Sequence, residues 1–496
     1  METLYLSTRN NSLKLKASEA IVKGISDDGG LFVPDHFPKL DVPLEKLAEM
    51  DYRGVAYEVM KLFFTDFTEV ELKYCINNAY DDKFDTEEIA PLSFVEDAYY
   101  MELFHGKTIA FKDMALSILP YLMTTSAKKN HISEKIIILT ATSGDTGKAA
   151  LAGFADVMGT GIVVFYPKGG VSRVQERQMV TQKGKNVKVV GIRGNFDDAQ
   201  TGVKNIFGDK EYAAELKKHG FILSSANSIN IGRLIPQVAY YVFAYTRLVK
   251  NGKILAGDPI NFTVPTGNFG NILAGYYASK IGLPVNKLIC ASNENKVLFD
   301  FFNTGVYNKN REFILTSSPS MDILVSSNLE RLIYEIVGND SARCKDLMTA
   351  LFGNGEYEVS AAEKALCSKF AAGYATEEQV SERIHEVYKE TGYVLDTHTA
   401  VASSVYKEYR RNAADKTPTV IVSTASPFKF TRSVMEALEG KNETEDDFEL
   451  IDRLSSMTGL EIPKAVEEIR NAEVLHNTVC EKDRMKEEVT SFLEKL

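Results

Sequence analysis

Six short runs of apolar, mostly β-branched residues stand out in the middle and late parts of the chain. They are KIIILTAT (135–142), GIVVFYP (161–167), NVKVVGIRG (186–194), NFTVPTG (261–267), KLICASN (287–293) and TPTVIVSTASP (417–427). Several of them lead through a turn into a stretch with helical spacing, as KAALAGFADVMG (148–159) follows the first. Alternating buried strands and helices are typical of a parallel sheet covered by helices. The pattern therefore predicts an α/β fold.

The two ends of the chain show other patterns. Residues 1–95 combine short turns such as SDDGG (26–30) with helical stretches such as LEKLAEMDYRGVAYEVMKLFF (44–64), which predicts a separate, mostly helical N-terminal domain. Residues 319–400 are mainly helical and polar. The last segment, 441–496, places Glu and Lys at helical spacing, so we expect a solvated helical segment there.

Composition narrows the functional classes. A chain of 496 residues is long enough for two or three domains. Its net charge of −11 argues against nucleic acid as a partner, because phosphate backbones need a basic surface. A small anionic substrate stays compatible, since a single pocket can be positive on an acidic protein.

Compartment and metal content are also constrained. The five cysteines are dispersed without a CxxC pair, which is typical of reduced thiols. The seven histidines show no HExxH spacing, so no metal site is predicted. The start, METLYLSTRN, lacks a secretory pattern, and no run of about 18 apolar residues suggests a membrane span. We expect a cytoplasmic protein with no membrane attachment.

A lysine in an apolar setting is the first candidate for chemistry. In FHGKTIAFKD (104–113), Lys112 stands between Phe111 and Asp113. A desolvated lysine has a lowered pKa and can attack a carbonyl carbon as the neutral amine. Most lysines are solvated surface charges, however, and that interpretation stays open for Lys112 alone.

Two turns are candidate anion sites. In VPTGNFGN (264–271) a strand ends, Gly267 and Gly270 bracket a bend, and a helix begins near Asn271. In TATSGDTGKAA (140–150) a hydroxyl-rich loop again precedes a helix. Backbone N–H groups at helix starts bind phosphate or carboxylate, although each turn alone is also explained as an ordinary strand-to-helix connection.

The three motifs together fit one cofactor. Pyridoxal 5'-phosphate needs an amine for its aldehyde, a site for its phosphate and a clamp for the carboxylate of an amino-acid substrate. An amine, a hydroxyl-rich loop and a glycine-rich turn occur here in that order on an α/β frame.

Nine motifs in order then identify a resemblance. The chain resembles the long-type threonine synthase family, within the tryptophan-synthase-β-like (fold type II) class of pyridoxal-phosphate enzymes. Besides the three motifs above, the resemblance rests on YLSTRN (5–10), DDGGLFVPDHFP (27–38), SSANSINIGRLIPQ (224–237), SPSMDILVSSNLER (318–331), DTHTAV (396–401) and STASPFKF (423–430). Two positions depart from the pattern: Ser426 replaces a histidine and Thr397 a proline.

The resemblance implies a domain plan. Two parallel-sheet α/β domains flank the cofactor, in addition to the N-terminal region. The larger, cofactor-binding domain would comprise 96–130 and 260–440, and the smaller domain, with the substrate loop, 131–259.

The resemblance also implies residue roles. Lys112 would be the Schiff-base lysine, and Thr424 would bond the pyridine nitrogen. The cofactor phosphate would be bound by Gly267, Asn268, Phe269, Gly270 and Asn271. The substrate carboxylate would face Ser143, Gly144, Asp145 and Thr146, and by residue type we expect the substrate phosphate at Asn227, Ser228, Asn230 and Arg233.

The implied reaction converts O-phosphohomoserine and water to threonine and phosphate, by γ-elimination followed by β-addition. Other members of the class stay open: a serine or threonine dehydratase, a phosphohomoserine phospho-lyase, or a cofactor-binding protein without catalysis. A monomer or a homodimer is expected.

Overall fold

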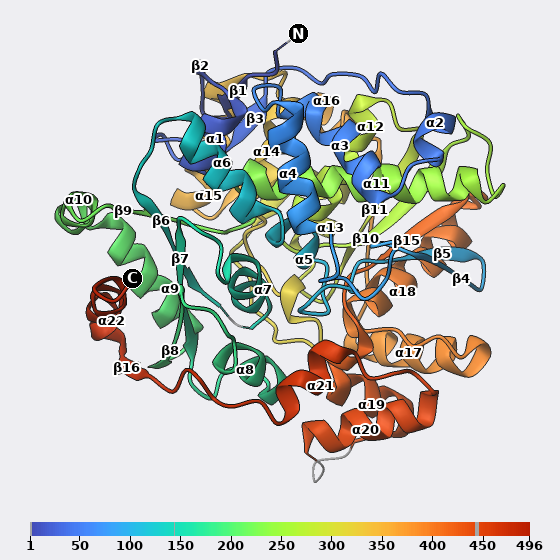
Figure 1. The fold of residues 1–496 in the computed structure, drawn as a ribbon. Coiled ribbons are helices and arrows are strands. Elements are labelled where there is room, and N and C mark those ends of the chain that lie inside the picture. The colour runs from blue at the N-terminus through green and yellow to red at the C-terminus, as the bar shows by residue number, and fades with distance from the viewer. Residues whose placement is uncertain (1, 143, 442–445) are drawn as a thin grey trace.

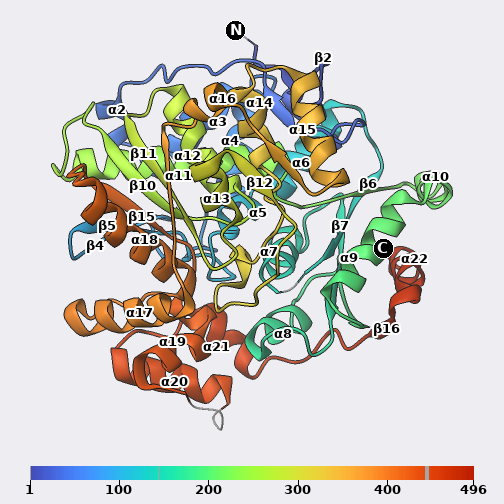
Figure 2. The same cartoon turned by 180° about the vertical axis from the view of Figure 1, so that it is seen from behind.

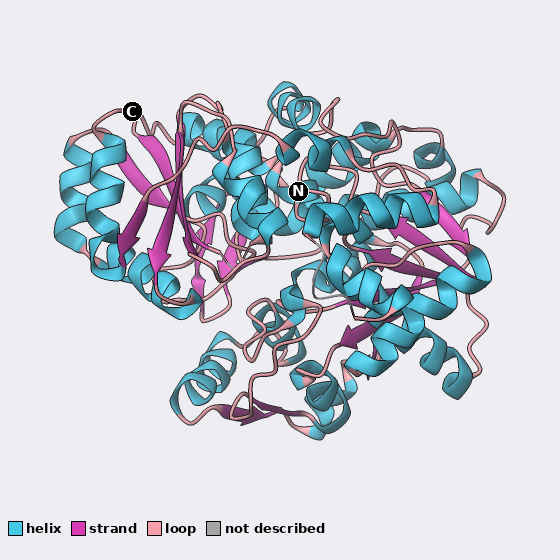
Figure 3. Ribbon diagram, turned by 90° about the horizontal axis from the view of Figure 1, so that it is seen from below, coloured by secondary structure: helices cyan, strands magenta, loops and turns pink. Residues whose placement is uncertain are grey.

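Two separate parallel sheets form the centre of the computed structural model, which describes residues 2–142, 144–441 and 446–496. Figure 3 shows them on opposite sides of the molecule, each with helices packed against it. The α/β prediction is confirmed. Strands 1–3 of the N-terminal region add a small antiparallel sheet in the order β2-β1-β3, with β1 (Tyr5–Ser7), β2 (Asn10–Leu15) and β3 (Phe32–Pro34).

The larger sheet has the strand order β14-β11-β10-β15-β5-β4. Its pairs are parallel except the hairpin between β4 and β5. The strands are β4 (Leu92–Val95), β5 (Ala98–Glu102), β10 (Ile260–Pro265), β11 (Val285–Ser292), β14 (Phe370–Tyr374) and β15 (Thr419–Ser423). Every residue of β10 and β15 is buried, as expected for central strands covered on both faces.

The smaller sheet is parallel throughout, in the order β16-β8-β7-β6-β9. Its strands are β6 (Lys135–Ala141), β7 (Thr160–Pro167), β8 (Val187–Arg193), β9 (Phe221–Ser224) and β16 (Val479–Glu481). Around it lie α7 (Asp145–Phe154), α8 (Arg173–Val180), α9 (Phe196–Gly208) and α10 (Lys210–Lys218) (Figure 1). All six strands predicted from apolar runs are present.

Helices cover the larger sheet and the N-terminal region. The longest, α11 (Ile231–Lys250), is almost wholly buried and packs against α3 and α12. The others are α1 (Ala17–Lys23), α2 (Leu44–Ala48), α3 (Tyr52–Phe63), α4 (Glu69–Ala79), α5 (Asp113–Leu116), α6 (Leu119–Lys129), α12 (Gly270–Ile281), α13 (Val297–Thr304), α14 (Leu329–Ile336), α15 (Ser341–Gly353), α16 (Ala361–Ala365), α17 (Glu377–Thr391), α18 (Thr397–Ala413) and α19 (Thr431–Glu439). A short hairpin joins β12 (Val306–Asn308) to β13 (Glu356–Glu358). Within the described ranges, no helix is long and apolar enough to cross a membrane.

The C-terminal segment connects the two sheet regions. Helices α20 (Asp447–Thr458) and α21 (Lys464–Arg470) lie beside α19, and the chain then runs across to β16 and α22 (Met485–Leu493) at the smaller sheet (Figures 1 and 2). Side chains of α22 complete an apolar cluster with β6, β7 and β8, including Met485, Val489, Phe492 and Leu493. This segment is helical as expected, but it is not simply solvated, because α22 buries an apolar face, and it also supplies an edge strand that the sequence pattern did not predict.

Candidate active site

Lys112 is held at the carboxyl end of the larger sheet. Residues 109–111 bond to the chain that leaves β15: the Phe111 N–H donates to the Thr424 carbonyl at 2.8 Å, and the Ser426 N–H to the Ile109 carbonyl at 3.0 Å. Ligands of parallel α/β sheets bind outside the carboxyl ends of strands, so the lysine lies where such a site is expected.

The Lys112 amine is buried among polar groups. The residue is only 9% exposed, and its Nζ donates to Ser320 Oγ at 2.8 Å and lies 3.5 Å from Asp145 Oδ2. Burial lowers the pKa of Lys112, the Asp145 carboxylate opposes that effect, and the nearby cations Lys429 and Arg233 add to it. The amine is therefore more easily neutral than a surface lysine, as nucleophilic attack requires.

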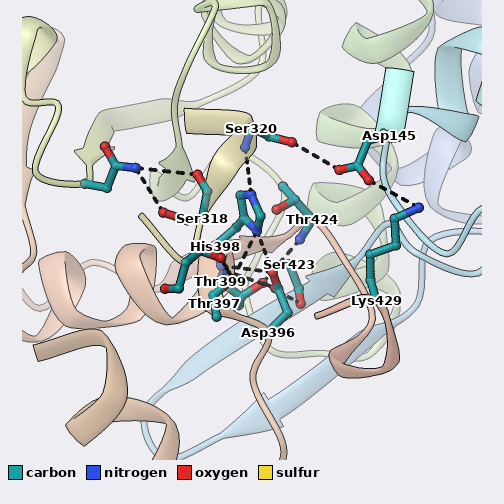
Figure 4. Close-up of polar contacts among 12 residues, drawn as sticks. Asp145, Ser318, Ser320, Asp396, Thr397, His398, Thr399, Ser423, Thr424 and Lys429 are labelled. Atoms are coloured by element: carbon teal, nitrogen blue, oxygen red, sulfur yellow. Dashed lines mark hydrogen bonds and ion pairs between the residues drawn. The ribbon is translucent and has the colours of Figure 1, made fainter. Parts of the chain in front are cut away.

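Asp145 is the anionic centre of the site. Its Oδ1 accepts from Gln175 Nε2 at 2.9 Å and lies 3.3 Å from Lys429 Nζ, while Ser320 Oγ donates to Oδ2 at 3.1 Å (Figure 4). Burial opposes ionisation, yet Lys429, Lys112 and the Gln175 amide hold the pKa of Asp145 well below its ordinary value. The side chain thus stays a carboxylate and serves as an anchor for cations instead of a proton acceptor.

The loop before α7 is shaped by Thr142. Its hydroxyl accepts from the Gly144 N–H at 2.9 Å and from the Gly147 N–H at 3.0 Å. Gly144 has φ +139°, and a Cβ there would lie 2.5 Å from the Gln175 side chain, so glycine is required. Thr146 is partly exposed, and the predicted Ser143 lies outside the described residues.

The glycine bend, residues 267–271, leads from β10 into α12. Phe269 precedes the helix with φ +64°, an uncommon conformation for a residue with a side chain. Asn271 Oδ1 accepts from Tyr240 and Tyr241 at 2.6 and 2.8 Å, whereas its buried Nδ2 has no partner among the described residues. Such an orphaned donor fits an anion.

Ser320 lies between Lys112 and the glycine bend. It belongs to the 3-10 turn η1 (Pro319–Met321), and its carbonyl oxygen would be 2.5 Å from a Cβ at Gly267. The structure therefore brings the predicted lysine, loop and bend to one place.

Thr424 immediately follows β15. It is 5% exposed, and its N–H donates to Thr399 Oγ1 at 3.3 Å. Its hydroxyl has no hydrogen-bond partner within the part of the chain that the structure describes, so it is available to a ligand atom.

The residues predicted for the substrate phosphate fall into two groups. Arg233 is 4% exposed, its Nη1 donates to the Ala226 carbonyl at 2.8 Å, and its buried Nε is unpaired in the described chain. Burial lowers the pKa of Arg233 to about 10.

Asn230 instead uses both side-chain groups structurally: its Oδ1 accepts from the Gly232 N–H at the start of α11, and its Nδ2 donates to the Ile21 carbonyl. Asn227 is exposed, and Ser228 Oγ lies 3.4 Å from Asn328 Nδ2.

Sequence reasoning gave no role to several residues that complete the site. Ser320, Gln175 and Lys429 all contact Asp145. Lys429 is fully buried, and its Nζ also donates to the Thr108 carbonyl and to Gln178 Oε1, each at 3.0 Å. Ser320 lies in the motif SPSMDILVSSNLER and Lys429 in STASPFKF, both of which support the resemblance. Their place in these motifs was the sequence signal that could have identified them as site residues.

Asp113 and His105 are held by hydrogen bonds within the chain. Asp113 accepts from Thr108 N and Oγ1, each at 2.7 Å. His105 bridges Asp85 and Glu102, and these carboxylates overcome burial and raise its pKa to about 9. In the described ranges no group of three or more His, Cys, Asp or Glu could hold a metal ion.

These residues fit pyridoxal phosphate. A buried amine, an unpaired amide at a helix start and an unpaired hydroxyl at the end of β15 correspond to the aldehyde, phosphate and ring nitrogen of that cofactor.

Comparison with known families supports this fit to pyridoxal phosphate. Residues 94–425 match the family described as pyridoxal-phosphate dependent enzyme, 4–80 match threonine synthase N terminus, and 399–479 match threonine synthase, C-terminal.

Individual relatives with threonine synthase in their names are similar to most of this chain. Threonine synthase of Saccharomyces cerevisiae is 36% identical, over 88% of this chain and 89% of the relative. Human threonine synthase-like 1 is 40% identical over 86% of this chain, and the match spans only 59% of that longer protein. A crystal structure of pyridoxal-phosphate-bound threonine synthase from Brucella melitensis superposes with a TM-score of 0.88 at 34% identity, covering 100% of this chain and 99% of the other.

Proposed function

The chain belongs to the threonine synthase family of pyridoxal-phosphate-dependent enzymes, and from that premise we propose that it converts O-phospho-L-homoserine and water to L-threonine and phosphate. The observation that carries the proposal is the buried Lys112 amine, joined through Ser320 to both the Asp145 carboxylate and the glycine bend.

The proposed cofactor residues surround Lys112. Pyridoxal phosphate, when bound, supplies an aldehyde for an amine and a conjugated ring that stores carbanion electrons. Lys112 would hold it covalently as the Schiff-base lysine, and the Thr424 hydroxyl would bond its ring nitrogen. The phosphate would be bound by Gly267, Asn268, Phe269, Gly270 and Asn271, and Asn271 Nδ2, which has no partner among the described residues, supports this assignment.

The loop before α7 binds the substrate carboxylate. The substrate carboxylate would face Ser143, Gly144, Asp145 and Thr146 at the start of a ten-residue helix, where the Asp145 and Thr146 N–H groups and the hydroxyls of Ser143 and Thr146 would bind it. The Gly144 N–H is already bonded to Thr142, so Gly144 contributes the shape of the loop. The Asp145 side chain is turned to the two lysines and does not oppose the substrate's negative charge.

Lys112 also moves the protons of the reaction. With substrate bound, its neutral Nζ would take one proton from the substrate α-carbon and one from the β-carbon, which lets phosphate leave the γ-carbon, and would then give protons to the γ-carbon and the α-carbon. The leaving phosphate would be stabilised by Arg233, whose buried Nε has no partner in the described ranges. Asn227 and Ser228 are nearby in sequence, and Asn230 holds the loop. Water then adds at the β-carbon.

An assay of products tests this proposal. Purified protein with pyridoxal phosphate and O-phosphohomoserine should release threonine and phosphate in equal amounts. Ammonia and a keto acid would instead identify a dehydratase or a phospho-lyase, and cofactor binding without turnover would identify a protein that has lost catalysis.

Cellular location and assembly follow from the same proposal. We place the protein in the cytoplasm as a monomer or homodimer, acting on a small molecule and on neither nucleic acid nor membrane. The absence of a membrane-spanning helix in the described ranges and the net charge of −11 support this placement.

A further inference from the structure

Ser320 makes the closest polar contact of the Lys112 amine. Lys112 Nζ to Ser320 Oγ is 2.8 Å, whereas Lys112 Nζ to Asp145 Oδ2 is 3.5 Å, beyond the usual range for such a bond. Asp145 is also shared with Lys429 at 3.3 Å. The long Lys112–Asp145 ion pair therefore constrains the direction of the Lys112 amine only weakly. The shorter bond to the Ser320 hydroxyl sets that direction.

The direction of the Ser320 hydroxyl is fixed by its two neighbours. A lysine ammonium only donates and a carboxylate only accepts, so the single hydroxyl proton must point to Asp145 Oδ2, 3.1 Å away. The Ser320 oxygen then offers its lone pair to Lys112.

A histidine and an aspartate hold Ser320 from behind. The Ser320 N–H donates to His398 Nε2 at 3.2 Å, which requires that Nε2 carry no proton, and the proton on Nδ1 is donated to Asp396 Oδ2 at 2.9 Å (Figure 4). Asp396 also accepts the N–H groups of His398 and Thr399 at the start of α18, so the pair is anchored to a 17-residue helix. The His398 ring lies 4.7 Å from the Phe430 ring, centroid to centroid.

The turn is also fixed on its other sides. Thr397 Oγ1 donates to the Ser317 carbonyl at 2.8 Å, and the Ser320 carbonyl lies against Gly267. Ser320 is thus held between α18 and the glycine bend. From this position it can set the distance between the Lys112 amine and the glycine bend.

We propose that Ser320 directs the Lys112 amine toward the cofactor aldehyde, and that His398 and Asp396 are positioning residues that act through Ser320. The inference rests on the proposed role of Lys112 as the cofactor-binding amine. It assigns a task to the segment SPSMD and to His398, which the reaction described above does not use.

The pH dependence of cofactor attachment tests this inference. The charged groups that face the Lys112 amine are Asp145 of α7, Lys429 of η2 (Pro427–Lys429) and Arg233 of α11. The titratable ring of His398, on α18, lies close to Asp145. Removing the Ser320 oxygen leaves all of them in place and takes away one acceptor that favours the charged amine. The midpoint pH for attachment should then fall.

The experiment uses the full chain freed of cofactor. Pyridoxal phosphate is added between pH 6 and 10, covalent attachment is followed by absorbance near ~410–420 nm, and the product is trapped with borohydride and located by peptide mass spectrometry. For Ser320→Ala we expect the midpoint to shift down by about half a unit to one unit. The trapped yield on Lys112 should also fall several-fold, because the free amine is no longer directed.

Matched variants separate the outcomes. Ser317→Ala, in the same loop and with a hydroxyl that makes no hydrogen bond in the described chain, should keep the wild-type midpoint, and Ser320→Thr, which keeps a hydroxyl, should restore it. His398→Phe keeps a ring over Phe430 and should shift the midpoint in the same direction as Ser320→Ala. A wild-type profile for Ser320→Ala overturns the inference, whereas wild-type protein that attaches no cofactor at Lys112 overturns the proposed function instead.

Discussion

At the scale of single residues, the site concentrates buried positive charge. Lys112, Lys148 and Lys429 are each 9% exposed or less, and the ionised carboxylate among them is Asp145. Asp113 lies close to Lys148 and Lys429, but burial raises its pKa. Uncompensated buried charge costs folding free energy and is typical of functional sites.

Lys148 shows that cost most clearly. Burial, followed by repulsion from Lys429, lowers the pKa of Lys148 from 10.5 to about 7, and its Nζ donates to Gln182 Oε1. Between these two pH values the unfolded chain binds a proton that the folded chain does not, so this group makes stability rise as the pH rises from 7 to 10.

We therefore expect Lys148→Met to raise the free energy of unfolding by roughly 1–3 kcal/mol at pH 7, and by less as the pH approaches 10. Chemical denaturation at several pH values measures the difference. Lys204→Met, on the exposed side of α9, should change stability by less than about 0.5 kcal/mol. A Lys148→Met protein less stable than wild type at every pH would contradict the assignment.

Residue roles were only partly accessible from sequence. The apolar neighbours of Lys112 made it a candidate for burial, which is a local property, and the other motifs in order strengthened that interpretation. Ser320 and Lys429 reach Asp145 from 175 and 284 positions away in the chain (320 minus 145, 429 minus 145), and no local pattern encodes such a contact.

At the scale of elements, the glycine bend and the turn η1 depend on each other. A Cβ at Gly267 would lie 2.5 Å from the Ser320 carbonyl oxygen and 3.3 Å from the Met321 Cα. Both atoms belong to the backbone, so a side chain could be accommodated only if the two elements moved apart.

Gly267→Ala should therefore weaken pyridoxal phosphate binding about 10- to 100-fold and lower stability by about 1–3 kcal/mol. Fluorescence titration of the cofactor and thermal unfolding measure the two effects. The control is Gly282→Ala at the other end of α12, where φ is +117° and nothing lies within 4 Å of the added Cβ. This control should lose about 1 kcal/mol of stability and keep the wild-type affinity; equal affinities for both variants would refute the coupling.

The elements predicted correctly share one physical property. Strands covered on both faces are apolar at most positions, so β6, β7, β10 and β15 were visible as nearly continuous apolar runs. Short or edge strands need no such run: β14, FAAGY, is mostly half-buried, and β16, VCE, is largely exposed. Their pairing is decided by tertiary contacts, which is why they were missed.

At the scale of the whole molecule, the C-terminal segment ties the two sheet regions together. The Arg177 guanidinium of α8 donates to the carbonyls of Ile469, Arg470 and Ala472, at 2.6–3.2 Å. Beyond it, the N–H groups of Leu475 and His476 donate to the Val180 carbonyl.

A chain that ends at residue 470 should lose much of the stability of the smaller sheet. It lacks β16, which covers the edge of β8, and the apolar side chains of α22 that pack on β6–β8. We expect a lower unfolding midpoint, faster proteolysis within 131–224 and binding of an apolar dye. Lys495→Ala, at an exposed position, should behave as wild type, and an unchanged melting curve for the truncated chain would show that α22 contributes nothing.

The pairing of β16 with β8 sets an order of events during synthesis. Val479 pairs with Gly191, a partner that leaves the ribosome almost 300 residues earlier. At ordinary elongation rates of about 5–20 residues per second, the nascent smaller sheet waits for tens of seconds with one edge open. Newly made molecules thus pass through a period in which the edge of β8 has no partner and can pair with another chain, until β16 has been synthesised.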